Sequence, residues 1–165
     1  MSRTRTLPDT QVLAQVLDAL TNGGDKAVSF GNLSRATGLA PATLAQRYGT
    51  VDGMIRAALA QEWDRLDAAV DQAGLDTQKG TQGYLKALPF PGLAVLSASL
   101  RDQALRERAE GWRTRVEAGL AVRRGGGTKG REAAALIFAA WQGRHIWDVA
   151  GGKAFRLADL TKRLG

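Results

Sequence analysis

The 165-residue sequence contains no cysteine and only one histidine, His145. Without cysteine it can form neither a disulfide framework nor a thiolate metal site, and a single histidine excludes most histidine-based metal sites. No run approaches the roughly 18 apolar residues of a membrane span, and the N-terminus lacks an apolar stretch of signal-peptide length. We therefore expect a soluble cytoplasmic protein that binds no metal and makes no contact with a membrane.

The chain also lacks the patterns that indicate catalysis. There is no cysteine nucleophile, no motif surrounds His145, and no Ser-His-Asp set has a spacing that can be placed in a site. The run Gly125–Gly127 follows no strand and precedes no Lys-Ser/Thr pair, so it reads as a connector and not as a phosphate loop. We expect no enzyme, no catalytic residue and no cofactor.

The net charge of +7, from 23 Lys/Arg and 16 Asp/Glu, suggests nucleic acid but is not concentrated in one place. Residues 1–56 hold six Lys/Arg against four Asp/Glu, whereas residues 57–165 hold 17 against 12. The basic segment Arg101–Arg131 is best explained as a solvated helix face. Binding to a DNA backbone depends on where cations stand along the phosphates, so total charge decides nothing here.

Residues 29–55 carry the strongest local signal, because they predict a helix, a sharp turn and a second helix. Ser29 is a good N-cap for a helix that runs to about Thr37. Gly38 can adopt the positive φ that ends a helix, and Pro41 is suited to the first position of the next one, which runs to about Tyr48. This is the helix-turn-helix arrangement, whose second helix enters the DNA major groove.

At these residues the sequence resembles the tetracycline-repressor (TetR) family of transcriptional regulators, most strongly over residues 8–60. The matching positions are Leu33, Ser34, Ala36, Gly38, Leu39, Ala40, Thr43, Leu44, Tyr48 and Met54. The resemblance implies a homodimeric regulator, most often a repressor, that binds a palindromic operator in double-stranded DNA. The DNA contacts that it implies here are Arg3, Arg5, Ser29, Asn32, Pro41, Thr43, Gln46, Arg47 and Thr50.

Two positions depart from the family pattern. The family's tyrosine that stacks on the DNA backbone falls at Ala45, and its phosphate-binding lysine falls at Val51. These departures leave a second interpretation open, a protein of the TetR fold that carries a lipid and does not bind DNA, as in quinone biosynthesis. A helical adaptor that binds other proteins is a third and weaker one.

The rest of the chain also reads as helical, and we expect an all-α fold. Apolar residues recur at helical spacing in the segments 8–21, 51–73, 101–124 and 129–149, with shorter helices between them and near the C-terminus. We expect a three-helix DNA-binding domain at residues 1–50 and a helical effector-binding and dimerisation domain at residues 51–165.

Two functions are expected of the second domain. The helix from Lys129 is apolar on most of its circumference and carries the small residues Ala139, Ala140 and Gly143, so we expect a homodimer through residues 129–164. In the family, aromatic side chains on these helices surround an effector pocket. Trp112, Phe138, Trp141 and His145 would then hold a small, mostly apolar effector, although core packing is the better explanation for each aromatic residue taken alone.

Overall fold

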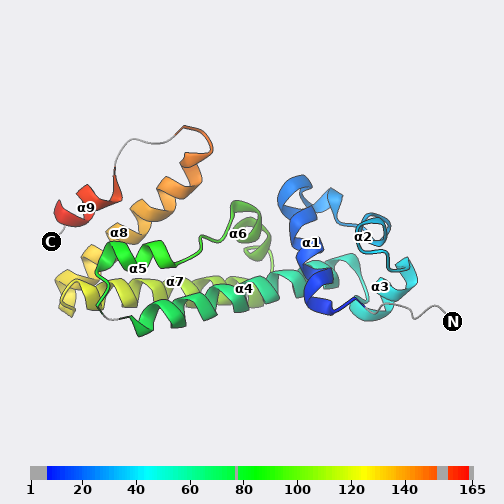
Figure 1. Ribbon diagram of the computed structural model, residues 1–165, viewed down its shortest axis with the longest axis horizontal. Coiled ribbons are helices and arrows are strands. Elements are labelled where there is room, and N and C mark those ends of the chain that lie inside the picture. The colour runs from blue at the N-terminus through cyan, green and yellow to red at the C-terminus, as the bar shows by residue number, and fades with distance from the viewer. Residues whose placement is uncertain (1–6, 77, 152–155, 164–165) are drawn as a thin grey trace. The chain divides into compact units, whose positions relative to one another are not determined.

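The structure is a computed structural model that describes residues 7–76, 78–151 and 156–163 (Figure 1). The described residues form helices and no strand, which confirms the predicted all-α fold. In chain order the elements are α1 (Asp9–Gly23), η1 (Asp25–Ala27), α2 (Phe30–Thr37), α3 (Pro41–Tyr48), α4 (Val51–Leu75), α5 (Thr81–Ala87), α6 (Leu93–Ser99), α7 (Gln103–Arg123), α8 (Gly127–Asp148) and α9 (Leu157–Arg163).

The chain forms two compact units. The first consists of Met1–Asp64 with Ala94–Arg106, and the second of Arg65–Leu93 with Glu107–Gly165. The boundaries fall inside α4, α6 and α7, so each of these helices contributes residues to both units. The predicted domains, residues 1–50 and 51–165, are a division by function that these packing boundaries do not test, and that division stays a prediction.

In the first unit, α2 and α3 have the bounds that the sequence predicts. The Ser29 hydroxyl caps α2 by accepting a hydrogen bond from the Asn32 amide at 3.1 Å. Gly38 ends α2 with a φ of 74°, and its amide donates to the Ser34 carbonyl at 2.8 Å. Since few residues other than glycine adopt this conformation without strain, Gly38 sets the angle at which α3 leaves the turn.

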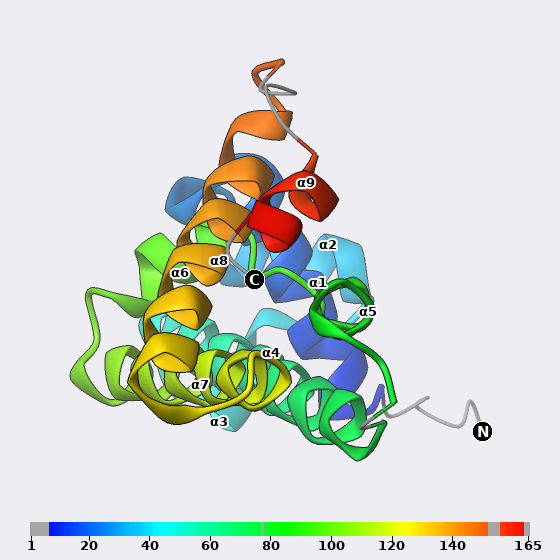
Figure 2. The ribbon, with the colours of Figure 1, turned by 90° about the vertical axis from the view of Figure 1, so that its left-hand side faces the viewer.

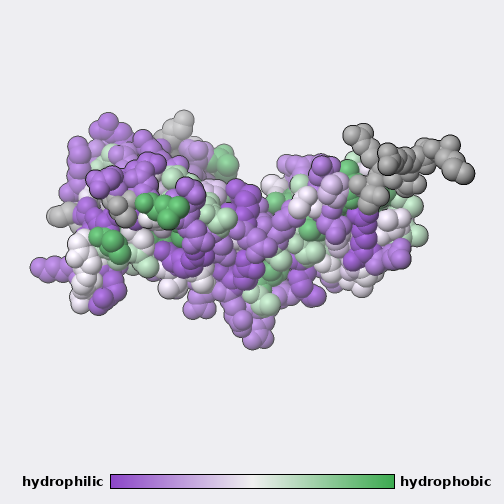
Figure 3. Space-filling model, turned by 60° about the horizontal axis from the view of Figure 1, so that its bottom comes forward, coloured by the Kyte–Doolittle hydropathy of each residue, from purple (hydrophilic) through white to green (hydrophobic). Residues whose placement is uncertain are grey.

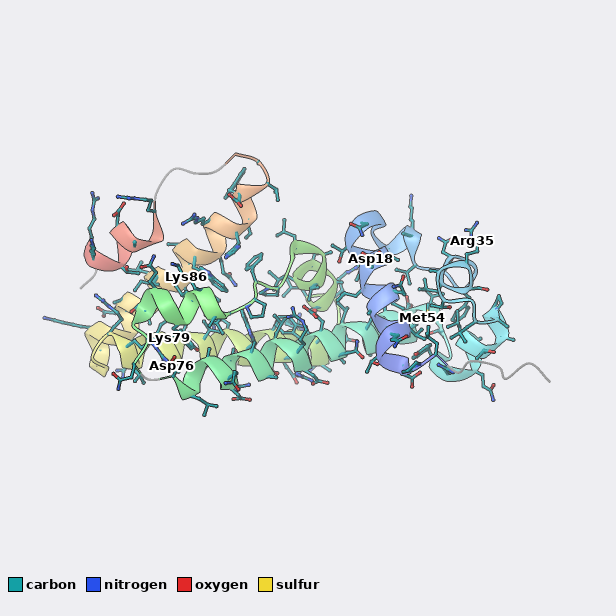
Figure 4. All side chains as sticks on the ribbon, in the orientation of Figure 1. Asp18, Arg35, Met54, Asp76, Lys79 and Lys86 are labelled. Carbon is teal, nitrogen blue, oxygen red and sulfur yellow. The ribbon has the colours of Figure 1, made fainter. Side chains whose placement is uncertain are left out.

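The core of the first unit lies among α1, α2, α3 and the start of α4. Val12, Val16, Leu44 and Met54 are fully buried, and Met54 is labelled in Figure 4. The apolar residues that recur at helical spacing in the segment 8–21 include Leu13, Val16, Leu17 and Leu20, and all of these are buried except Leu17, which is half-buried. On the face of the molecule drawn in Figure 3, apolar side chains form small separate groups among hydrophilic ones, as expected when most apolar area is in the interior.

One buried hydrogen bond joins α6 to α4 in the first unit. Trp63 is fully buried, and its indole N–H donates to the hydroxyl of Ser99, which is buried too, at 2.9 Å. Two ion pairs flank this contact: Arg101 pairs with Asp25 through two donors, one of them at 3.0 Å, and Arg56 pairs with Asp102 at 2.8 Å. The segment that follows α6 is therefore attached to both η1 and α4.

The second unit pairs the last part of α4 with α7 through charged side chains. Asp67 accepts hydrogen bonds from Arg108 at 3.0 Å and from Arg115 at 2.8 Å, and Arg115 also pairs with Asp71. Arg123 donates to the backbone carbonyls of Ala73, Asp76, Lys79 and Gly119. These arginines belong to the basic segment that the sequence assigned to a solvated face, and several of them are in fact engaged in holding the fold.

Gly119 in α7 allows a close approach by the buried side chain of Tyr84 from α5. A Cβ placed on Gly119 would lie 2.4 Å from the Tyr84 hydroxyl oxygen. The Tyr84 ring is 1% exposed, and the Arg123 guanidinium lies 4.2 Å from its centre. The ring contacts α7 at two positions one turn apart and is almost wholly buried, so it has little room to move away from an added methyl group.

We therefore expect opposite effects from one substitution at two positions of α7. Gly119→Ala should lower the free energy of unfolding by about 1–3 kcal/mol, because the methyl group overpacks the Tyr84 contact. Gly111→Ala, at an exposed position with no atom within 4 Å of the added Cβ, should raise it by about 0.5–1 kcal/mol through helix propensity. Urea unfolding of both variants measures this, and equal effects at the two positions would contradict the account.

The two faces of α8 differ in exposure but are both apolar. Ala134, Ile137, Phe138 and Trp141 point into the second unit and are buried. About half a helical turn away around the axis, Leu136 is 57% exposed and Trp147 is 64% exposed. Between them Ala139 is exposed, and Ala140 and Gly143 are half-buried. We call Leu136, Ala139, Ala140, Gly143 and Trp147 the outer face of α8. Figure 2 shows the course of the α8 helix itself.

Candidate nucleic-acid interface and effector groove

The N-terminal part of α3 presents a surface that could enter a DNA groove. Pro41 and Gln46 are exposed and Thr43 is half-buried, while Leu44 on the opposite side is fully buried in the first unit. This pattern holds the helix by one face and leaves the polar side chains of the other accessible, which base contacts in a major groove require.

Arg47, predicted as a DNA contact, is engaged within the protein. One guanidinium nitrogen donates to the Leu7 carbonyl at 2.9 Å and to the Asp9 carboxylate at 3.1 Å. The Tyr48 hydroxyl donates to the same carboxylate oxygen at 2.9 Å, and burial together with Asp9 raises the pKa of Tyr48 to about 12. Arg47 thus attaches the end of α3 to the start of α1 through one of its guanidinium nitrogens. Its contact with DNA stays a prediction.

Three other predicted DNA contacts have structural roles. Asn32 donates from its side-chain amide to the Ala27 carbonyl at 2.9 Å and accepts from Arg35. Ser29 caps α2, and the Thr50 hydroxyl caps α4 by accepting from the Gly53 amide at 2.9 Å. Such caps fix the turns that orient α3. Their direct contact with DNA stays a prediction, and Arg3 and Arg5 lie outside the described residues.

Arg35 is a candidate that the sequence analysis missed. It is exposed near the end of α2 and is labelled in Figure 4. The available signal was its spacing, because it lies one helical turn after Asn32 and so shares a face with it. Its guanidinium donates to the Asn32 side chain, which holds a cation beside the helix-turn-helix.

The four residues predicted to hold an effector divide into two groups. Trp112, Phe138 and Trp141 are at most 4% exposed, and their ring centres are 6.1–6.3 Å apart, so they form an aromatic core cluster in the second unit. His145 is exposed at the edge of this cluster, stacked on Phe90 with ring centres 4.8 Å apart. Trp112 and Phe138 are core residues that do not line the groove described next, whereas Trp141 and His145 do. That any of the four holds an effector stays a prediction.

That groove, which we call the effector groove after the effector that the sequence resemblance predicts, has a volume of about 590 Å³ and lies in the second unit. Its lining comes from α5, α8 and α9, with Leu88 just after α5 and Arg156 just before α9. The lining residues are Gln82, Leu85, Lys86, Leu88, Trp141, Arg144, His145, Asp148, Arg156 and Ala158. A volume of this order fits the usual range for small-molecule sites.

Among the described residues, no group of His, Asp or Glu side chains is arranged to hold a metal ion. No helix in the same part of the chain is long and apolar enough to cross a bilayer.

The fold is shared with solved structures of transcriptional regulators. A transcriptional regulator from Rhodococcus sp. Rha1 is 18% identical, with a TM-score of 0.67 over 96% of this chain and 92% of that chain. A TetR transcriptional regulator from Legionella pneumophila is 13% identical, with a TM-score of 0.63 over 99% and 96%. Salmonella enterica GusR is 17% identical, with a TM-score of 0.55 over 98% and 95%.

No protein-family model and no curated protein sequence matches the chain. The structural matches nevertheless extend over nearly the whole length of both compared chains, so they include the second unit as well as the helix-turn-helix. The protein therefore has the fold of TetR transcriptional regulators, and the fold implied by the sequence resemblance is confirmed.

Proposed function

We propose that the protein is a transcriptional regulator that binds a palindromic DNA operator as a homodimer in the cytoplasm and represses transcription until an effector binds. The observation that carries this proposal is α3: a helix of eight residues, anchored by buried Leu44, with Pro41, Thr43 and Gln46 accessible after a Gly38 turn. An anchored helix with an open polar face is the part of a helix-turn-helix that reads bases.

The outer face of α8 supports the homodimer. A single chain leaves Leu136 and Trp147 largely exposed on a face whose central residues are alanine and glycine. Large apolar side chains on an otherwise small-residue surface favour close helix packing, and a two-fold axis would bring the same face of a second copy against it. The two helix-turn-helix segments of such a dimer would then bind two DNA half-sites related by the same axis.

Selection of bound sequences from random double-stranded DNA tests the proposal. We expect enrichment of a motif with two-fold symmetry, whose half-sites are separated by about one helical turn, 10–10.5 base pairs, or a multiple of it. Unsymmetrical motifs, or no enrichment over the starting pool, would count against a dimeric operator reader. A variant with Gln46→Ala and Thr43→Ala is the control, because it should remove the enrichment without exposing the buried Leu44 anchor.

The lipid-carrier interpretation is based on the residues Ala45 and Val51. Both side chains are partly exposed, one on α3 and one at the first residue of α4, so both sites are accessible yet offer no polar group. If the selection fails while the effector groove binds apolar ligands, the carrier function is favoured over regulation.

A further inference from the structure

The effector groove combines an apolar floor with a cationic rim. Leu85, Leu88 and Trp141 line it and are each at most 6% exposed, so their accessible atoms form its floor. Lys86 on α5 and Arg144 on α8 line it as well and are exposed. Figure 4 labels Lys86 on α5, and α9 packs against both α5 and α8.

The positive charge of the rim exceeds the negative charge. Among the described residues that line the groove, Lys86, Arg144 and Arg156 are the cations and Asp148 is the one carboxylate. The side chain of Arg156 is bound to Asp159 at 2.9 Å, whereas those of Lys86 and Arg144 make no hydrogen bond or ion pair with another described side chain. The groove is therefore lined by two cations, one on α5 and one on α8, that no described carboxylate neutralises through an ion pair.

His145 adds a neutral polar edge to the groove. Its ring lies 4.8 Å from Phe90 and 5.1 Å from Trp141, centre to centre, so both neighbours restrict its orientation. Desolvation, and then the nearby Arg144, lower the pKa of His145 below the ordinary value of 6.5, although Asp148 opposes them. At neutral pH the imidazole is uncharged, and it can donate or accept a hydrogen bond without adding to the rim charge.

We propose that the effector groove binds a small organic carboxylate with an apolar body. The body lies on Leu85, Leu88 and Trp141, and the carboxylate lies between Lys86 and Arg144. This assignment deepens the proposed function by naming the class of its effector, and as a statement about binding it can be tested without DNA. It replaces the predicted pocket around Trp112 and Phe138, since those two side chains pack in the core.

Calorimetric titration with matched probe pairs tests the assignment. The probes are octanoate against octan-1-ol, and 2-naphthoate against naphthalen-2-ylmethanol, each with the full-length protein and no DNA. Charge-assisted hydrogen bonds to a carboxylate are stronger than neutral ones. We therefore expect at least one carboxylate to bind about tenfold or more tightly than its alcohol, with quenching or a shift of tryptophan fluorescence from Trp141.

Two double variants locate the anion. Lys86→Ala with Arg144→Ala should abolish the preference for the carboxylate, while leaving the weaker binding of the alcohol. Arg113→Ala with Arg131→Ala lowers the net charge equally at exposed cations outside the groove, and should leave the preference intact. Circular dichroism confirms that each variant is folded.

Three outcomes would overturn the assignment: equal affinity for carboxylate and alcohol, an unchanged preference in the Lys86/Arg144 variant, or no binding of any probe at millimolar concentration. None of them bears on DNA recognition, because the Lys86/Arg144 variant keeps α2 and α3 intact and its affinity for the selected operator is measured separately. If the protein fails to bind an operator but retains its preference for the carboxylate, the proposed regulator function is rejected and the proposed carboxylate site is retained.

Discussion

Leu136→Glu is expected to convert the protein from a dimer into a monomer at micromolar concentration. Leu136 is 57% exposed in the single chain, so a glutamate there is hydrated and should leave the folding of one chain nearly unchanged. In a two-fold interface through the outer face of α8, each subunit would bury one unpaired carboxylate. The desolvation penalty is several kcal/mol per ion, which outweighs the apolar area that the leucine contributes.

Sedimentation equilibrium measures the change directly, and Ala135→Glu is the matched control. Ala135 is exposed on the same helix, but at the flank of the outer face, so the same charge should be tolerated there. Operator affinity should fall with the loss of the dimer, because two half-sites are then bound independently. A Leu136→Glu protein that still sediments as a dimer would place the interface elsewhere.

Arg47→Ala is expected to weaken specific operator binding by about 1–3 kcal/mol, the usual value of an arginine that reads a base. Two causes could produce such a loss, since Arg47 also attaches α3 to Leu7 and Asp9. Asp9→Ala distinguishes them, because it removes the Asp9 contact but keeps the guanidinium. If Arg47 binds DNA, Asp9→Ala should leave affinity unchanged or raise it, since a carboxylate that competes with phosphate is removed.

Fluorescence anisotropy with the selected operator provides the affinities, and urea unfolding provides the control for stability. The Asp9 side chain of the Arg47–Asp9 ion pair is 66% exposed. Because exposed ion pairs contribute little, the free energy of unfolding of either variant should fall by no more than about 1 kcal/mol. Equal losses of operator affinity in Arg47→Ala and Asp9→Ala would mean that Arg47 acts only by positioning α3.

The sequence predicted α2 and α3 with the correct bounds because their end signals are local. Ser29 caps the helix that begins at the next residue, Gly38 terminates that helix, and Pro41 begins the following one. None of these signals depends on distant parts of the chain. The short helix η1 was not predicted, since three residues between glycine and an extended valine carry no periodicity.

The engagement of individual side chains was not predictable in the same way. Arg47 meets Asp9 across 38 positions of sequence, and the effector groove takes its lining from α5, α8 and α9. Such contacts depend on how helices pack, which a helical pattern does not specify. The aromatic residues illustrate this limit: the pattern gave Trp112 and Trp141 the same two possible roles, and only packing separates a core position from one that also lines a groove.

The most direct test of the proposed function is the salt dependence of DNA binding. The affinity for DNA from the region upstream of the protein's own gene is compared with the affinity for unrelated DNA of equal length. A specific dimeric reader should bind the upstream DNA at least about 10³-fold more tightly at physiological salt. Its affinity should fall linearly on a log-log plot against salt, with a slope set by the phosphates that it contacts. Equal affinity for the two DNAs, or no measurable binding at low salt, would contradict the account.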